Sequence, residues 1–166
     1  MDISMRLMNE TDWPFVSEIY QQGIETGKAT FQSDIPAYSE WDASHIKECR
    51  FVAVHGGKVV GCTALSKVSS RCVYGGVAEV SIYIAENYRG KGVGQKLLQH
   101  LITESEKAGF WMLQSGIMED NINSIGLHKK CGFRQVGYRE RIGRDVHEKW
   151  RSTVLMEKRS EVAGAD

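Results

Sequence analysis

The sequence predicts a mixed α/β fold in which a β-hairpin precedes a β-α-β-α core. Residues 77–85 read VAEVSIYIA, where apolar and polar positions alternate as they do in a strand. Residues 93–102 carry apolar side chains at helical spacing. The segment RFVAVHGGKVVGCTALSKV holds two apolar runs separated by Gly56 and Gly57, which is a hairpin signal. No repeat or linker interrupts these elements, so we expect one domain over residues 1–166.

The N-terminal part of the chain predicts a strand followed by two helices. DISMRL, at residues 2–7, has strand character. Thr11 or Asp12 can cap the next helix, and Pro14 lies in its first turn, where its missing N–H costs nothing. After an irregular stretch we expect a second helix over residues 39–48.

The C-terminal part predicts a strand, a helix and two further strands. WMLQSGIM reads as a strand, and NINSIGLHKKC as a helix opened by Asn121. FRQVGYRERIG and KWRSTVLMEKR then read as the two strands that close the fold.

Bulk composition excludes several classes of protein. Lys plus Arg and Asp plus Glu each number 21, so no chain-wide field attracts nucleic acid or an anionic membrane. No apolar run approaches the roughly 20 residues needed to span a bilayer, and MDISMRLMNETD lacks the layout of a signal peptide. We therefore expect a cytoplasmic protein. The four cysteines (Cys49, Cys62, Cys72 and Cys131) form no C-x-x-C pair, which predicts reduced thiols and no metal site.

The glycine cluster RGKGVG lies between the strand at 77–85 and the helix that follows. Gly90, Gly92 and Gly94 fall where a helix has free backbone N–H groups, so a pyrophosphate can approach closely and meet the positive end of the helix dipole. Taken alone, such a turn can equally be a plain cap. The Walker spacing and the dinucleotide spacing are both absent, because no Ser or Thr follows the lysine and the glycines read G-x-G-x-G.

The motifs together resemble those of the GNAT acetyltransferase superfamily. R-x-x-G-x-G, at Arg89, Gly92 and Gly94, resembles its acetyl-CoA pyrophosphate loop, and NINSIGLHKKCGF resembles its second conserved block. More narrowly, IYQQGIETGKATF, AEVSIYI, SIGLHKKCGF and KWRSTVL are similar to the phosphinothricin acetyltransferase branch. This resemblance covers roughly residues 5–156.

The resemblance implies a fold and a co-substrate. It implies a strongly twisted, mixed but mostly antiparallel sheet, with helices on both faces and splayed central strands that hold acetyl-CoA. No metal is implied. The residues implied to bind acetyl-CoA are Ile82, Tyr83, Ile84, Arg89, Gly90, Lys91, Gly92, Val93, Gly94, Gln95, Asn121 and Ser124.

Direct acetyl transfer to an amine needs a base for the ammonium proton and a proton donor for the leaving thiolate. Glu79 is the candidate base, because it lies on the polar face of the strand, three residues before the expected thioester contact. The alternative is a solvated glutamate on a strand edge. His128 is the candidate acid on the resemblance, with a structural histidine equally open, and Tyr83 can serve instead if it is not a packing residue.

The acceptor pocket is expected from the same branch. Its candidate residues are Thr30, Phe31, Cys72, Val73, Tyr74 and Trp150. Gly75, Val77 and Ser152 replace the Arg, Thr and Asp of the branch, and the lost arginine removes a partner for an acidic group. We expect a small amino-acid-like amine of the phosphinothricin or methionine sulfoximine type, a resistance role and a homodimer. The alternatives are a protein amino group as acceptor, or a non-catalytic acyl-CoA sensor.

Overall fold

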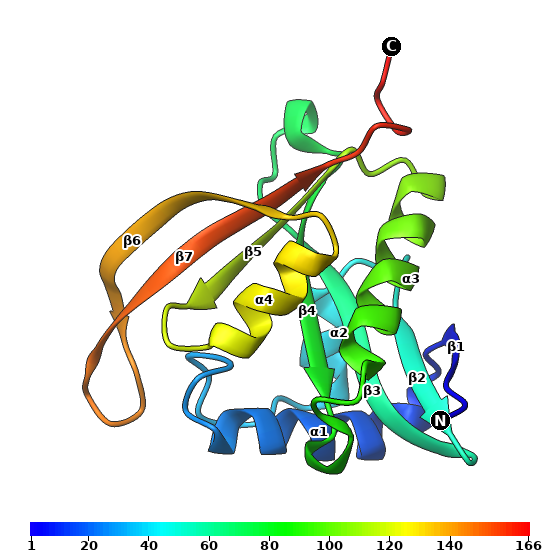
Figure 1. The fold of residues 1–166 in the computed structure, drawn as a ribbon, viewed down its shortest axis with the longest axis vertical. Coiled ribbons are helices and arrows are strands. Elements are labelled where there is room, and N and C mark those ends of the chain that lie inside the picture. Colours follow the sequence, from blue (N-terminus) through cyan, green and yellow to red (C-terminus); the bar gives the residue numbers. More distant parts are fainter.

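The computed structural model describes all 166 residues, which form one seven-stranded sheet with helices packed on it (Figure 1). The strands are β1 (Ser4–Leu7), β2 (Phe51–His55), β3 (Lys58–Lys67), β4 (Val77–Ile84), β5 (Met112–Met118), β6 (Arg134–Arg144) and β7 (Trp150–Arg159). The helices are α1 (Trp13–Glu25), α2 (Tyr38–Ser44), α3 (Val93–Lys107) and α4 (Ile122–Lys130), with 3-10 turns at Glu10–Asp12, Cys72–Tyr74 and Glu86–Tyr88. The strand order is β1-β2-β3-β4-β5-β7-β6.

Every strand predicted from the sequence is present, and the hairpin and the β-α-β-α core are confirmed. Gly56 and Gly57, both with positive φ, join β2 to β3. Asn121 caps α4, where its side chain accepts the N–H of Ser124. None of the helices combines the length and the apolarity that a bilayer span requires.

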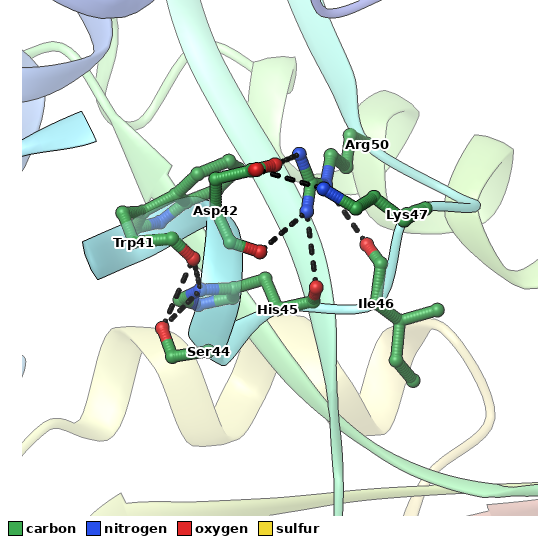
Figure 2. A network of polar contacts seen from close by, with 7 residues as sticks. All are labelled: Trp41, Asp42, Ser44, His45, Ile46, Lys47 and Arg50. Atoms are coloured by element: carbon green, nitrogen blue, oxygen red, sulfur yellow. Dashed lines mark hydrogen bonds and ion pairs between the residues drawn. The ribbon is translucent and has the colours of Figure 1, made fainter. Parts of the chain in front are cut away.

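The second helix is shorter than predicted. It ends at Ser44 instead of continuing to residue 48, because hydrogen bonds to other parts of the fold hold the backbone at and just after its end. The guanidinium of Arg50, at the edge of β2, donates to the carbonyls of Asp42, His45 and Ile46 (Figure 2). The N–H of Ile46 donates to the carbonyl of Leu65 in β3, which draws the chain into an extended path. The spacing of apolar residues within one helix carries no information about hydrogen bonds to distant parts of the chain, so the sequence pattern could not predict this end.

Helices cover both faces of the sheet. On one face α3 buries Leu97, Leu98 and Leu101 in the larger core cluster, which includes Leu65 of β3. On the other face α1 packs Val16 and Ile19 against Val52 of β2 and Cys62 of β3. Because side chains alternate along a strand, each strand serves both layers.

The four cysteines form no disulfide. Burial raises the pKa of Cys49 to about 11 and that of Cys62 to about 12. These two thiols therefore stay protonated at neutral pH, which agrees with the expected reduced state.

β4 and β5 are the only parallel neighbours, and they separate after three paired positions. Val77, Ala78 and Glu79 pair with residues 112–114, and no pairing follows. β4 continues to Ile84 along β3, whereas β5 follows β7, so the two strands diverge in a V. All other neighbouring pairs are antiparallel. The predicted mostly antiparallel sheet with splayed central strands is thereby confirmed.

Candidate active site

A cleft of about 590 Å³ opens where β4 and β5 diverge. Its walls come from the end of β4, the glycine loop before α3, the inner side of α4 and the loop that follows α1. The lining residues are Gly23, Thr26, Lys28, Ala29, Ile82, Tyr83, Ile84, Tyr88, Arg89, Gly90, Gly92, Gly94, Gln95, Asn121, Asn123, Ser124, Gly126, Leu127 and Lys130. Ten of the twelve residues expected to bind acetyl-CoA are among them.

The edge of β4 that faces the cleft carries unpaired backbone groups. Just past this strand, the N–H of Ala85 donates to the carbonyl of Val60 at 2.9 Å, on the β3 side. Because successive residues in a strand direct their backbone groups to opposite sides, those of Ile82 and Ile84 point away from β3 into the cleft. The Ile84 carbonyl accepts the Nε–H of Arg89 at 3.1 Å, which agrees with a carbonyl that points away from β3. The edge thus offers free donors and acceptors to an extended ligand.

The glycine loop forms a cradle at the N-terminus of α3. Gly90 and Gly92 have φ of 71° and 82°, in the left-handed region that favours glycine, and a Cβ built at either would meet no atom within 4 Å. Gly92 is the residue that precedes the first turn of α3, so free N–H groups of that turn face the open space. Arg89 adds a positive charge beside them. This arrangement suits an anionic group such as a pyrophosphate.

Two residues expected to bind the cofactor lie outside the cleft lining. The Lys91 ammonium lies 5.7 Å from the ring centre of Tyr88, in a cation–π contact. The Val93 side chain is buried in the core below α3. Only its backbone N–H can face a ligand.

The wall formed by α4 was predicted only at Asn121 and Ser124. Asn123, Gly126, Leu127 and Lys130 line the cleft from this helix, at spacings of three, one and three residues. That spacing is one helical face, so a helical projection of residues 122–130 contains the signal. The small Gly126 leaves open space in the middle of the face, because no atom lies within 4 Å of a Cβ built there.

Glu79 lies at the apex of the V. It is the last β4 residue paired with β5, opposite Gln114, and its Oε1 lies 3.9 Å from a Cβ built on Gly116. Its side chain is partly exposed and has no hydrogen-bond partner within the chain. A strand rises about 3.3 Å per residue, so Glu79 is about 10 Å along β4 from the free edge at Ile82. Glu79 is not among the residues that line the cleft.

Tyr83 faces α1. Its ring packs against Gly23, where a Cβ would come within 2.8 Å, and against the ring of Tyr20, 4.5 Å between centres. Burial, with the neighbouring Tyr20, raises the pKa of Tyr83 well above 10. Its phenol therefore keeps its proton at neutral pH. It is also part of the cleft lining.

His128 lies in the core and not in the cleft lining. It is 1% exposed and packs edge-on against Phe133, with ring centres 5.0 Å apart. Its Nδ1 lies 2.7 Å from the Ser124 carbonyl, which can only accept, so Nδ1 carries the proton. Burial lowers the pKa of His128, so the ring is neutral at pH 7, and its Nε2 is left as a buried acceptor without a partner.

The predicted acceptor residues fall in separate places. Thr30 and Phe31 follow α1, and the Phe31 ring lies 3.3 Å from a Cβ built on Gly143 of β6. The turn Cys72–Tyr74 lies before β4, near the upper end of that strand in Figure 1. Trp150 begins β7 and stacks with two arginines of β6. The chain alone does not gather these residues into one pocket.

Local contacts explain the residue at Ser152, where the branch has Asp, and at Gly76, beside Gly75. Ser152 is buried, and its Oγ accepts the N–H of Arg141 at 2.9 Å, which holds a bulge of β6 where Arg141 has a φ of 47°. Gly76, next to Gly75, is required by packing, because a Cβ there would lie 2.0 Å from the Trp111 ring.

Comparison with known proteins agrees with this geometry. The acetyltransferase (GNAT) family model matches residues 13–133. A phosphinothricin N-acetyltransferase of Alcaligenes faecalis is 32% identical over 161 residues, covering 93% of this chain and 81% of that protein. An L-methionine sulfoximine/L-methionine sulfone acetyltransferase of Pseudomonas paraeruginosa is 26% identical, covering 95% and 94%. The crystal structure of a Sinorhizobium meliloti phosphinothricin acetyltransferase in complex with acetyl-CoA superposes with a TM-score of 0.87 at 27% identity, covering 100% and 92%.

A glycine cradle at a helix N-terminus, joined to a free strand edge inside a splayed sheet, defines a protein that binds a pyrophosphate-bearing extended cofactor. The chain belongs to the acetyltransferase (GNAT) family and is an acetyl-CoA-dependent N-acetyltransferase. Its resemblance to the phosphinothricin acetyltransferase branch is confirmed at modest sequence identity. Acetyl-CoA fits the residues present, since the open space at Gly90 and Gly92 is where a Cβ would obstruct a phosphate.

Proposed function

We propose that this enzyme transfers the acetyl group of acetyl-CoA directly to the primary amine of a small amino-acid-like molecule, of the phosphinothricin or methionine sulfoximine type. The observation that carries the proposal is the place of Glu79, a side chain without an internal partner at the apex of the V between β4 and β5. The relatives named for phosphinothricin and methionine sulfoximine support the acceptor class.

In the proposed reaction Glu79 receives the ammonium proton, directly or through a water, so that the neutral amine can attack the thioester carbonyl. The carbon–nitrogen bond forms as the carbon–sulfur bond breaks, and the coenzyme leaves as a thiolate. Free N–H groups on the edge of β4 at Ile82 and Ile84 are positioned to stabilise the negative charge on the carbonyl oxygen.

Tyr83 and His128 remain the candidates that assist the departing thiolate. The N–H of His128 is already given to Ser124, and its ring is buried and neutral. Tyr83 lines the cleft and keeps its proton, so it can donate a hydrogen bond to the thiolate. Its raised pKa makes full transfer to a thiolate of pKa about 8.5 unfavourable, so solvent supplies the final proton. The proposal therefore places Tyr83 ahead of His128.

A thiol-release assay with acetyl-CoA tests the function. The panel comprises phosphinothricin, methionine sulfoximine, common amino acids, a peptide with a free N-terminal amine and a lysine-containing peptide. The proposal expects turnover on small amino-acid analogues, with product mass increased by one acetyl group. Turnover on peptides alone would assign a protein acceptor, and tight coenzyme binding without turnover on any amine would indicate an acyl-CoA sensor.

We also propose that the enzyme is a homodimer. β6 is an edge strand on which Val136, Tyr138 and Ile142 are exposed, a composition that favours burial against another chain. Sedimentation at micromolar concentration is expected to show a dimer. A monomer at all concentrations would contradict it.

A further inference from the structure

Arg151 of β7 joins three segments that are far apart in the sequence. Its side chain is only 16% exposed. Nη1 donates to the Gly27 carbonyl at 2.7 Å and to Asp145 Oδ2 at 3.2 Å, and Nη2 donates to Asp120 Oδ1 at 2.6 Å. These partners belong to the loop after α1, the β6–β7 hairpin and the β5–α4 connection. One guanidinium thus ties the loop after α1 to two other parts of the fold.

A second bond crosses at the same place. Nδ2 of Asn121 donates to the Lys28 carbonyl at 3.2 Å. Asn121 opens α4, whereas Lys28 belongs to the loop after α1. This loop lies beneath the N-terminal end of α4 in Figure 1. These bonds tie the loop after α1 to the start of α4 across the opening of the cleft between β4 and β5, which Lys28 and Asn121 both line.

The bridged loop carries the residues expected to contact the acceptor. Thr30 and Phe31 follow the two bridged carbonyls after one intervening residue, and the Phe31 ring lies against Gly143 of the same hairpin that Arg151 holds through Asp145. The Asp145 carboxylate also accepts the backbone N–H groups of His147 and Lys149, so the tip of the hairpin is itself ordered. Any movement of the loop after α1 therefore changes where Phe31 lies relative to the opening.

We propose that Arg151 is a positioning residue for the acceptor amine: it fixes the width of the opening opposite Glu79 and the place of Thr30 and Phe31. The inference rests on the proposed function, since it assigns the acceptor to this side of the opening. A planar guanidinium suits the task, because it donates in several directions at fixed angles, which an ammonium cannot do. The glycine cradle at α3 lies outside the bonded set, whereas Asn121, which is expected to contact acetyl-CoA, belongs to it.

The test compares Arg151→Ala and Arg151→Lys with Arg134→Ala. Arg134 lies on the neighbouring strand and forms one exposed ion pair, with Glu157, so its loss removes the same charge without untying a segment. For Arg151→Ala we expect the KM for the amine to rise by about 10-fold or more, while kcat and the Kd for acetyl-CoA change by less than about 3-fold. Arg151→Lys is expected to lie between, and guanidinium ions added at millimolar concentration should lower the KM of Arg151→Ala.

Hydrogen exchange gives a readout that needs no acceptor. Arg151→Ala should speed amide exchange in residues 26–32 and leave β3 unchanged. An unchanged KM together with a lower melting temperature would show that Arg151 only stabilises the fold. If Arg151→Ala does not fold, Asp120→Asn tests the proposal instead, because it weakens one hydrogen bond of Arg151 and should also raise the KM for the amine. If the unaltered enzyme acetylates no amine, the proposed function fails, while exchange in residues 26–32 still decides whether Arg151 orders the loop.

Discussion

Replacement of Gly92 by alanine should weaken acetyl-CoA binding while the fold persists. Gly92 precedes α3 with a φ of 82°, and a Cβ added there points into open space of the cleft. Gly57 is a matched control. It has a φ of 77°, also has open space around an added Cβ, and lies in the β2–β3 turn, away from the cleft.

The two substitutions should cost similar stability and different affinity. A left-handed backbone costs an L-residue about 1–2 kcal/mol, so both variants should be destabilised by about that amount. At Gly92 the methyl group also blocks a phosphate from the N–H groups of α3. One charge-assisted hydrogen bond contributes about 1.5–3 kcal/mol, so the affinity should fall by about 10- to 100-fold.

Calorimetric titration with acetyl-CoA, alongside urea unfolding, measures both effects. Gly57→Ala should bind the coenzyme as the unaltered protein does. Equal affinity in Gly92→Ala, with an intact circular dichroism spectrum, would place the pyrophosphate elsewhere. Equal losses in the two variants would show that the effect is one of stability and not of the cradle.

Three further predictions follow from single contacts. Gly126→Leu should leave stability within about 1 kcal/mol, because open space surrounds the site, yet should abolish coenzyme binding by titration; retained binding would remove α4 from the site. Hydrogen bonds from Arg6 lower the pKa of Asp12, so this carboxylate stabilises the fold above pH about 3.9 and the gain is lost on acidification. Between pH 7 and pH 3 the free energy of unfolding in urea should therefore depend less on pH for Asp12→Asn than for the unaltered protein, and parallel curves for the two proteins would contradict this. Among the cysteines only Cys72 is exposed, so a thiol reagent should label one site quickly in the folded protein and four after unfolding; rapid labelling of more than one would contradict the packing.

The parts of the cleft that are formed by residues close together in the sequence could be predicted from the sequence. The alternation in residues 77–84 and the spacing of Gly90, Gly92 and Gly94 are short-range patterns that survive folding unchanged. The signal for the rest of the α4 wall is equally local, because Asn123, Gly126, Leu127 and Lys130 share one face of the helix.

Features that depend on long-range contacts could not be predicted in the same way. The early end of α2 depends on Arg50, and the bridge across the opening of the cleft depends on Arg151, whose partner carbonyl at Gly27 is 124 positions away. The burial of His128 follows from packing against Phe133. The end of α2, the bridge at Arg151 and the burial of His128 each depend on residues outside the helix or strand concerned. The pattern of a single sequence does not show which of these residues come into contact.

The rate of acetyl transfer by Glu79→Gln as a function of pH tests the central claim most directly, with Glu140→Gln, an exposed carboxylate of β6, as the control for lost charge. Glutamine keeps the shape of the side chain but cannot take a proton, so acetyl-CoA affinity should stay the same while turnover at neutral pH falls by about 10²- to 10⁴-fold. Raising the pH toward the pKa of the amine supplies free amine and should partly restore the variant. Normal turnover of Glu79→Gln at neutral pH would contradict the account, and a rate that stays low at high pH would assign Glu79 to substrate positioning instead of proton removal.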